Sequence, residues 1–486
     1  MIPLVLADEK IDKNYYDKNI TKIYEIKKLK DVIPQIQASL ILCLFNMMMG
    51  ITLSFSGILI PEIEKADSNF QTTTSDNSWI ASVHFITMVL WSPVAGVLID
   101  NIGRLKTIRL SIIPSITGWI LIASGTNTTI VIIGRAFLGV GAVMSCCSAG
   151  VYITETAWPT MRGTLLEVSC VTAAIGMELT YLQSFAMYWR TMAWSYILCY
   201  LIIASLTFLL YESPVWLIKK GKTKNARKSL EWLHKYQTSQ TNQNLADIHL
   251  AILIYEGDVR KRNQSKIGKI PQSISAFLNP TVYKPVSIIS FIIILQQFSG
   301  YYIIEANAIS FFTSVGSSID PLVSSNLVTT LPIVISIMNL YTIKRFPRKT
   351  ILISSCLGSA ICLFVSGLFT KWINDGTTNQ KWVPVFFIFL FMAIAMAGWE
   401  PVPWIMLAEM VPQELRGLIM SIMMAAGSCI MFLAIYSFRF MRNSMGIFEL
   451  QMFYGSVALL GSIVVYFILP ETRGKTLMEI EEIFKR

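Results

Sequence analysis

The chain has 486 residues, of which 53% are hydrophobic and 14% are charged, and its formal net charge is +10. Soluble domains carry about 25% charged residues, so this composition excludes an ordinary soluble protein and predicts a polytopic membrane protein. A spanning helix needs about 20 apolar residues, and the length accommodates roughly ten to fourteen spans.

Twelve apolar runs follow one another along the chain, and long runs in lipid must be helical because every backbone group needs an internal partner. The runs cover residues 37–60, 78–100, 107–124, 129–154, 163–185, 191–211, 283–305, 321–343, 349–370, 383–408, 416–438 and 446–469. We expect an all-α membrane protein with twelve transmembrane helices in two six-helix bundles and short intracellular helices. The expected parts are an N-terminal tail (1–36), a first bundle (37–211), a linker (212–282), a second bundle (283–469) and a C-terminal tail (470–486).

The positive charges are concentrated in the first tail and in the linker. Residues 1–36 hold seven lysines and residues 212–282 hold twelve Lys and Arg residues, whereas the loops on the other side hold few. The positive-inside rule puts both segments, and therefore both termini, in the cytoplasm. The linker favours helix, and its basic faces are compatible with a plain connection, with contact to anionic lipid, or with small helices under the bundles, which we favour. We expect a multi-pass plasma-membrane protein that binds no nucleic acid.

Several other site types are not indicated. The apolar residues 2–6 are followed by charged residues rather than by a cleavage site, so they are not a signal peptide. Eight cysteines without a metal-binding spacing and three scattered histidines predict no metal, and we expect no cofactor. The sequon at Asn127 lies in a very short external loop, where we expect no glycosylation.

A charged pattern occurs twice, once in each half of the chain. Glu155 is followed by Arg162-Gly163, and Glu409 is followed at the same spacing by Arg416-Gly417. Other features also recur at matching places. The second run ends in Gly96-x3-Asp100-x2-Gly103-Arg104, and the eighth run is followed by the basic segment Lys344–Lys349. The sixth run is followed by Glu212-Ser213-Pro214, and the twelfth by Pro470-Glu471-Thr472-Arg473-Gly474. Acids and bases near span ends also reach toward water without any shared function, but matched spacings favour two related halves of a transporter.

These motifs, together with Gly134-Arg135 and Tyr152-Ile153-x-Glu155, resemble those of the sugar porter branch of the major facilitator superfamily. The resemblance covers residues 37–480. Within the branch, Gln296-Gln297-Phe298-Ser299-Gly300 and the missing fifth-span glutamine are most similar to insect facilitated trehalose transporter-like proteins.

The resemblance implies two clusters of salt bridges that hold the cytoplasmic side shut while the outer side is open. One consists of Arg104, Glu155, Arg162 and Glu212, and the other of Arg348, Glu409, Arg416 and Glu471. Replacing Arg162 by Ala is then expected to favour an inward-open state. The second copy is imperfect, because Lys344 and Pro347 stand where the family has an acid and a glycine.

The resemblance also implies a sugar site. Gln296, Gln297, Tyr302 and Trp404 are the expected substrate-binding residues; an interhelical hydrogen bond is the alternative role for the glutamines. Gly300, Gly398, Pro401 and Pro403 are expected to break the seventh and tenth helices and let them act as gates.

Several family positions are changed in this chain. The fifth-span glutamine corresponds to Cys170, the seventh-span asparagine to Tyr302, the outer-gate tyrosines to Ala306 and Asn307, and an eleventh-span pair to Gly427-Ser428. These changes are compatible with a different sugar pose, another polyol, or no transport.

Two acids, Glu305 and Glu400, fall within spans, where an acid is a functional candidate. Glu305 lies near a span end, where access to water is the simpler explanation. Glu400 is the candidate coupling acid. The first span (38–60) contains no acid, whereas proton-coupled sugar porters usually carry one there, and this favours uniport.

We therefore expect a monomeric facilitated transporter of a hexose or a disaccharide such as trehalose or glucose, and not an enzyme. The alternatives are a proton-coupled sugar or polyol symporter and a non-transporting sugar sensor.

Overall fold

The computed structural model describes residues 29–64, 72–236, 245–266, 280–307, 311–313, 321–410 and 416–471. This part of the chain contains helices and no strand. Of Arg162, Glu409 and Arg416 only the backbone is described, and the predicted tails fall largely on residues 1–28 and 472–486, outside the described residues.

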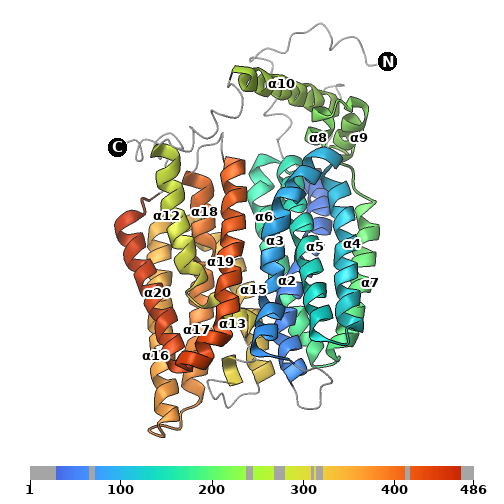
Figure 1. Cartoon of the computed structure of the whole chain (residues 1–486). Helices are drawn as coiled ribbons and strands as arrows, with labels where there is room; N and C mark the ends of the chain where they lie inside the picture. Colours follow the sequence, from blue (N-terminus) through green and yellow to red (C-terminus); the bar gives the residue numbers. More distant parts are fainter. Residues whose placement is uncertain are drawn as a thin grey trace.

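The first half consists of six long helices that pack side by side (Figure 1). They are α2 (Ile33–Glu64), α3 (Thr74–Ile102), α4 (Arg104–Ser124), α5 (Thr128–Thr156), α6 (Pro159–Ser184) and α7 (Trp189–Thr207).

The second half has six matching spans, two of which are broken. They are α12 (Pro280–Gln297) with α13 (Tyr301–Ala306), α15 (Pro321–Arg345), α16 (Arg348–Asn374), α17 (Trp382–Ile394) with η3 (Ala395–Trp399) and α18 (Pro401–Met410), α19 (Arg416–Met445) and α20 (Ile447–Ile468).

All twelve predicted runs thus fall on helices, and the expected fold is confirmed. Ten helices of the described part are long and apolar enough to cross a membrane by length and composition. The helices α6 and α15 pack against the other spans, α6 on α2 and α15 on α6 and α17, and the side chains of several of their residues lie outside the described part.

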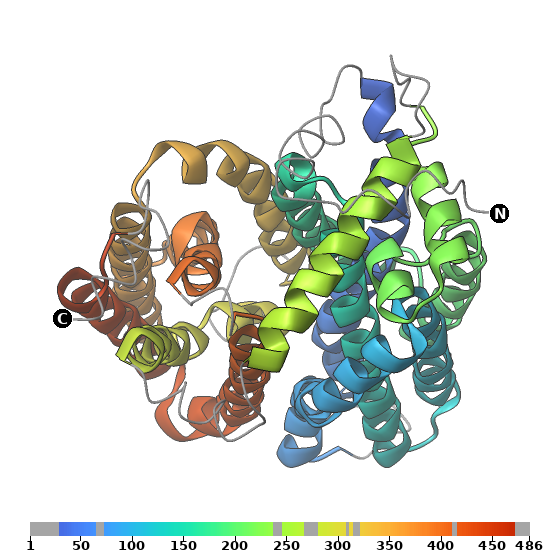
Figure 2. The same ribbon diagram turned by 90° about the horizontal axis from the view of Figure 1, so that it is seen from above.

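Three linker helices lie at one end of the bundles: the short α8 (Pro214–Lys219) and α9 (Thr223–Leu233), and the longer α10 (Leu245–Lys266) (Figure 1). We call this end the linker end and the opposite end the far end. Seen from above, α10 crosses the end of the first half toward the second (Figure 2). The start of α2 is also at the linker end, because α2 contacts α9 and the Gln35 side chain accepts a hydrogen bond from the Trp158 N–H at 2.9 Å.

Small residues let the helices of the first half approach closely. A Cβ atom on Gly118 of α4 would lie 2.7 Å from the Gly134 carbonyl oxygen of α5, and one on Gly134 would lie 2.8 Å from that of Gly118. Such contacts are typical of membrane helices, whose association depends on packing rather than on the hydrophobic effect. The two halves meet along α3 with α19 and along α6 with α15.

Asn127 lies directly before α5 and caps it. Its side-chain oxygen accepts a hydrogen bond from the Ile130 N–H at 2.9 Å. Such a cap satisfies one of the free N–H groups of the first turn, so the residue has a structural role in the loop.

Candidate functional site

The seventh span breaks at Gly300, between α12 and α13. Gly300 has a φ of +96°, and a Cβ atom there would lie 2.7 Å from the Tyr454 ring of α20. Glycine adopts this left-handed conformation at little cost, and here it also leaves room for the aromatic ring. The break therefore depends on both the backbone freedom and the small size of this residue.

The tenth span is irregular around its two prolines. The η3 segment is a π-helical turn, in which the Glu400 N–H donates to the Ala395 carbonyl at 3.0 Å instead of to Met396. Pro401 and Pro403 have no N–H, so they cannot donate to the carbonyls one turn earlier. The Trp399 carbonyl is one of those left without its backbone donor.

Side chains from three other helices bond to backbone carbonyls of this irregular segment. Gln296 of α12 donates its Nε2 to the carbonyls of Trp399 and Glu400, at 2.7 and 2.9 Å. Asn339 of α15 donates to Met396 at 2.9 Å, and Ser355 of α16 donates to Ile394 at 2.6 Å. The broken segment is therefore held in one conformation from several sides.

Sequence reasoning missed Asn339 and Ser355. Each is a polar residue within a predicted apolar run, which was the available signal. Their targets, however, are backbone carbonyls in the irregular part of the tenth span, which only the folded structure identifies.

The predicted sugar residues lie at these two breaks. Gln296 and Gln297 are buried, and the Oε1 atom of each has no hydrogen-bond partner among the described residues. The Tyr302 ring packs edge-on against Tyr301, with 5.1 Å between their centroids. A Cβ atom on Gly427 of α19 would lie 3.0 Å from the Trp404 ring, so the changed residue in the eleventh span makes space for that indole.

Glu400 and Glu305 are both buried near these residues, at 4% and 7% exposure. Neither carboxylate oxygen of Glu400 has a hydrogen bond of good geometry in the described part of the chain, although the Tyr302 hydroxyl lies close to it, and Oε1 of Glu305 has no partner there either. The two acids are within electrostatic range of each other. Tyr301 and Tyr302 are near both acids, Cys356 is near Glu400, and Tyr181 of α6 is near Glu305.

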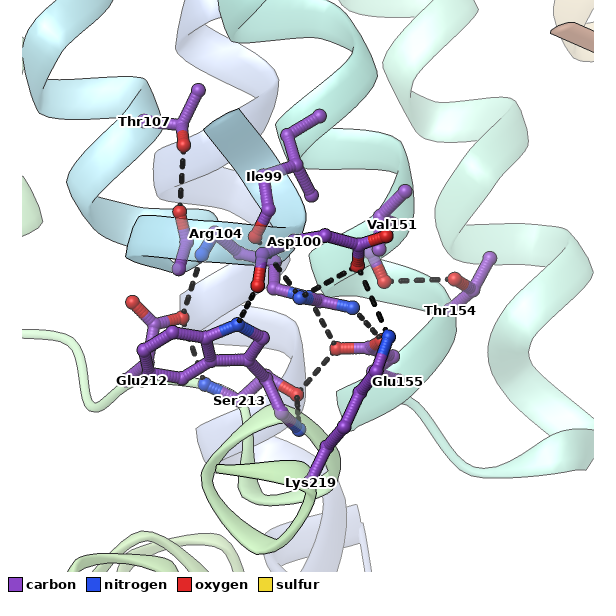
Figure 3. Close-up of polar contacts among 12 residues, drawn as sticks. Ile99, Asp100, Arg104, Thr107, Val151, Thr154, Glu155, Glu212, Ser213 and Lys219 are labelled. Carbon is purple, nitrogen blue, oxygen red and sulfur yellow. Dashed lines mark hydrogen bonds and ion pairs between the residues drawn. The ribbon is translucent and has the colours of Figure 1, made fainter. Parts of the chain in front are cut away.

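At the linker end, Arg104 and Glu155 form a two-bonded ion pair (Figure 3). The Arg104 Nε and Nη2 atoms donate to the two carboxylate oxygens of Glu155 at 2.9 and 2.6 Å, and Ser213 donates to the same carboxylate at 2.5 Å. Asp100 lies 3.6 Å from Arg104 Nη1 and 3.6 Å from Lys219 Nζ. Paired hydrogen bonds of this kind fix the geometry of both charged groups.

Glu212 belongs to this region in a different way from that implied by the resemblance. Its carboxylate accepts hydrogen bonds from the backbone N–H groups of Arg104 at 3.1 Å and of Leu105 at 3.1 and 3.2 Å. An anion is favoured there by the free N–H groups and the dipole of α4. Gly103 allows this contact, because it has a φ of +111° and a Cβ atom there would lie 2.7 Å from Glu212 Oε2.

The second half repeats this cap. Glu471 accepts hydrogen bonds from the N–H groups of Arg348 at 3.1 Å and of Lys349 at 3.0 Å, at the start of α16. Pro347 in place of glycine is compatible with the cap, since its φ is −60°. The side chains of Arg162, Lys344, Glu409 and Arg416 lie outside the described part, so the predicted ion pairs of these residues remain predictions.

Comparison with known proteins agrees with this architecture. The model of the family described as "Sugar (and other) transporter" matches residues 35–484. The chain belongs to this family.

Among the relatives of this sugar transporter chain are two facilitated trehalose transporters. That of Apis mellifera ligustica is 28% identical over 93% of this chain and 88% of the relative, and that of Culex quinquefasciatus is 27% identical over 92% and 85%. The xylose transporter XylE of E. coli, in an inward open conformation, superposes with a TM-score of 0.73 at 19% identity, covering 92% of this chain and 98% of XylE. The chain is thus a multi-pass membrane protein with the major facilitator fold, and it is not an enzyme.

Proposed function

We propose that this protein is a facilitated carrier of a neutral sugar, a hexose or a disaccharide such as trehalose or glucose, and that it works by alternating access. The observation that carries the proposal is the meeting of two broken helices at Gln296, within a chain whose family match covers both halves. Glutamine oxygens without a partner and nearby aromatic rings are suited to sugar hydroxyls and sugar faces.

The proposed orientation follows the distribution of positive charge. The linker end faces the cytoplasm, both termini lie on that side, and the membrane is the plasma membrane. We further propose that Gln296, Gln297, Tyr302 and Trp404 contact the sugar, and that the breaks at Gly300, Gly398, Pro401 and Pro403 move as gates. The proposed carrier is a monomer whose linker helices contact lipid.

Counterflow in proteoliposomes tests the proposal, with trehalose, glucose, fructose and polyols as the panel. We expect the wild-type protein to exchange at least one sugar and Trp404→Ala to lose this exchange. Trp382→Ala is the control and should keep it, because the Trp382 indole is exposed at the start of α17. Folding is checked by size-exclusion chromatography. If the folded protein exchanges none of these compounds, the carrier proposal fails and the sensor alternative gains support.

Burial of Glu400 without a basic partner among the described residues favours a second candidate, a proton-coupled carrier. A carboxylate is poorly solvated in the membrane interior, so a group at this position that takes up a proton loses an unfavourable charge. Glu305, Tyr301, Tyr302 and Cys356 are the titratable groups near it. In that case an inward proton gradient drives sugar accumulation.

The two candidates differ in their response to a pH gradient. If transport is coupled to protons, the wild-type protein accumulates sugar along the pH gradient. Glu400→Gln then keeps counterflow but loses accumulation. Asp375→Asn, the control change of an exposed acid, keeps both activities. For uniport, wild type shows counterflow but reaches the same sugar concentration on both sides at any gradient. This second outcome is the one we expect, because the first span has no acid.

A further inference from the structure

An ion pair joins the two halves of the molecule at the far end. Glu64 is the last residue of α2, and Arg439 lies in the last third of α19. Arg439 Nη1 is 2.5 Å from Glu64 Oε1. The Arg439 side chain is 5% exposed and that of Glu64 is 38% exposed, so this is a partly buried contact rather than a surface pair.

A third residue orients the carboxylate. Asn77, buried near the start of α3, donates its Nδ2 to the same Oε1 atom of Glu64 at 2.7 Å. The first half thus holds Glu64 from two helices and presents it to an arginine of the second half. We call Glu64, Asn77 and Arg439 the far-end cluster.

Aromatic side chains pack beside the far-end cluster on the same helices. Trp79 of α3 lies 5.7 Å from the Phe432 ring and 5.4 Å from the Tyr436 ring of α19, measured between centroids. Phe432 and Tyr436 stack on each other at 5.6 Å. These rings close the seam between α3 and α19 just inside the ion pair, where their contact area stabilises the closed arrangement.

The charged contacts described at the linker end do not join the halves. Arg104 and Glu155 belong to the first half, and Glu212 and Ser213, at the start of the linker, bond to these two residues and to Leu105. Glu471 caps α16 within the second half. The far-end ion pair therefore acts on the relative position of the two halves, whereas these contacts stabilise each half by itself.

We propose that the far-end cluster holds the two halves together at the end opposite the linker, and that this end opens only when the pair between Glu64 and Arg439 breaks. Glu64 and Arg439 are positioning residues for alternating access; only this link to transport rests on the proposed function. Opening moves both charges into water, which solvates them, so the pair stabilises the closed end without preventing reversible opening.

The neighbouring charges make the two single substitutions unequal. Arg442, one turn from Arg439, is within electrostatic range of both Arg439 and Glu64. Removing the acid leaves two nearby cations that repel each other, whereas removing Arg439 leaves Glu64 near Arg442. We therefore expect Glu64→Gln to open the far end more than Arg439→Gln does.

Hydrogen–deuterium exchange of the full chain in lipid nanodiscs tests the proposal without any sugar. In Glu64→Gln and Arg439→Gln we expect faster exchange at the far ends of α2, α3 and α19. The ratio of open to closed molecules should change about tenfold, as for a pair that is only partly shielded from water. The exchanged-charge variant Glu64→Arg with Arg439→Glu should recover much of the protection.

Glu449→Gln is the matched control, because Glu449 is an exposed acid in the first turn of α20, at the same end. Thermal unfolding checks that all variants are folded. The proposal is overturned if both folded single variants show the same hydrogen exchange at these ends as wild type. It is also overturned if the exchanged-charge variant shows no more protection there than the single variants. A changed exchange pattern in a protein that transports no sugar would leave the cluster's role intact and reject the carrier function alone.

Discussion

Gln296 illustrates how one side chain can support both the fold and the site. Its amide N–H group bonds to the carbonyls of Trp399 and Glu400, while its Oε1 atom has no partner among the described residues. The interhelical hydrogen bond that sequence reasoning gave as the alternative role is present in the structure. The sugar contact remains a proposal, and it requires only the oxygen that this bond does not use.

This division of roles leads to a prediction for the two glutamines. Gln296→Leu removes the donor to two buried carbonyls, and a buried group left unpaired costs about 1–3 kcal/mol. We expect a clearly lower unfolding temperature in detergent together with loss of counterflow. Gln297→Leu is the matched comparison, and we expect it to weaken counterflow with little change in unfolding temperature. Wild-type thermal stability of Gln296→Leu would contradict the structural role.

The helices of the linker are held to the first half by a small set of specific contacts. His234, directly after α9, and His249 of α10 are buried, and their ring nitrogens lie 2.8 Å apart. The Trp158 ring stacks on His234 at 6.4 Å between centroids. Arg227 Nε lies 2.8 Å from Asp247. Because Trp158 directly precedes α6, these contacts connect the linker helices to the start of a spanning helix.

This packing should depend on pH. Burial, and secondarily the charge of His234, lowers the pKa of His249 from 6.5 to about 3. Below pH 6.5 an undocked α10 takes up a proton that the docked helix does not, so docking loses about 1.4 kcal/mol per pH unit until the pH approaches the lowered pKa. Near pH 5 the loss is about 2 kcal/mol; docking is fully stable above pH 6.5.

Limited proteolysis of α10 at pH 7.5 and 5.5 measures this effect. We expect cleavage of wild type to increase at the lower pH relative to His249→Gln, which cannot titrate at this position and which controls for the protease's own pH dependence. Equal changes in the two proteins would show that His249 does not control docking.

At the scale of the whole molecule, the two halves differ in how they are held internally and meet along two helix pairs, α3 with α19 and α6 with α15. The first half has close backbone contacts, for a Cβ atom on Gly176 of α6 would lie 2.0 Å from the Met47 carbonyl oxygen of α2. The second half instead contains both broken helices, whose backbone groups are satisfied by side chains. The presence of both broken helices in the second half is compatible with gates that move there.

The close contact between α2 and α6 predicts a strong effect on stability. Gly176→Ala puts a methyl group into a backbone carbonyl that cannot move aside without separating the helices, so we expect overpacking to cost about 1–3 kcal/mol. The unfolding temperature of the purified protein should fall. Gly150→Ala is the control, because nothing lies within 4 Å of a Cβ atom there, and it should unfold like wild type. Equal unfolding temperatures for the two variants would refute the packing argument.

The sequence was sufficient to predict the twelve spans, the two halves and the family, because the transfer of apolar residues into lipid and the spacing of charged motifs are local properties. It also indicated where two helices break, since Gly300 and the prolines near Glu400 change the backbone at their own positions. It did not predict that Glu212 and Glu471 cap helices, since that requires the free N–H groups of α4 and α16 to lie beside them.

Only the tertiary structure showed the residues that act on distant backbone or on the other half. Asn339 and Ser355 donate to carbonyls of the irregular tenth span. Glu64 and Arg439 are 375 residues apart, and neither belongs to a repeated motif. Their pairing depends on how α2, α3 and α19 dock, and docking is decided by the packing of whole helices, which no local pattern of residues encodes.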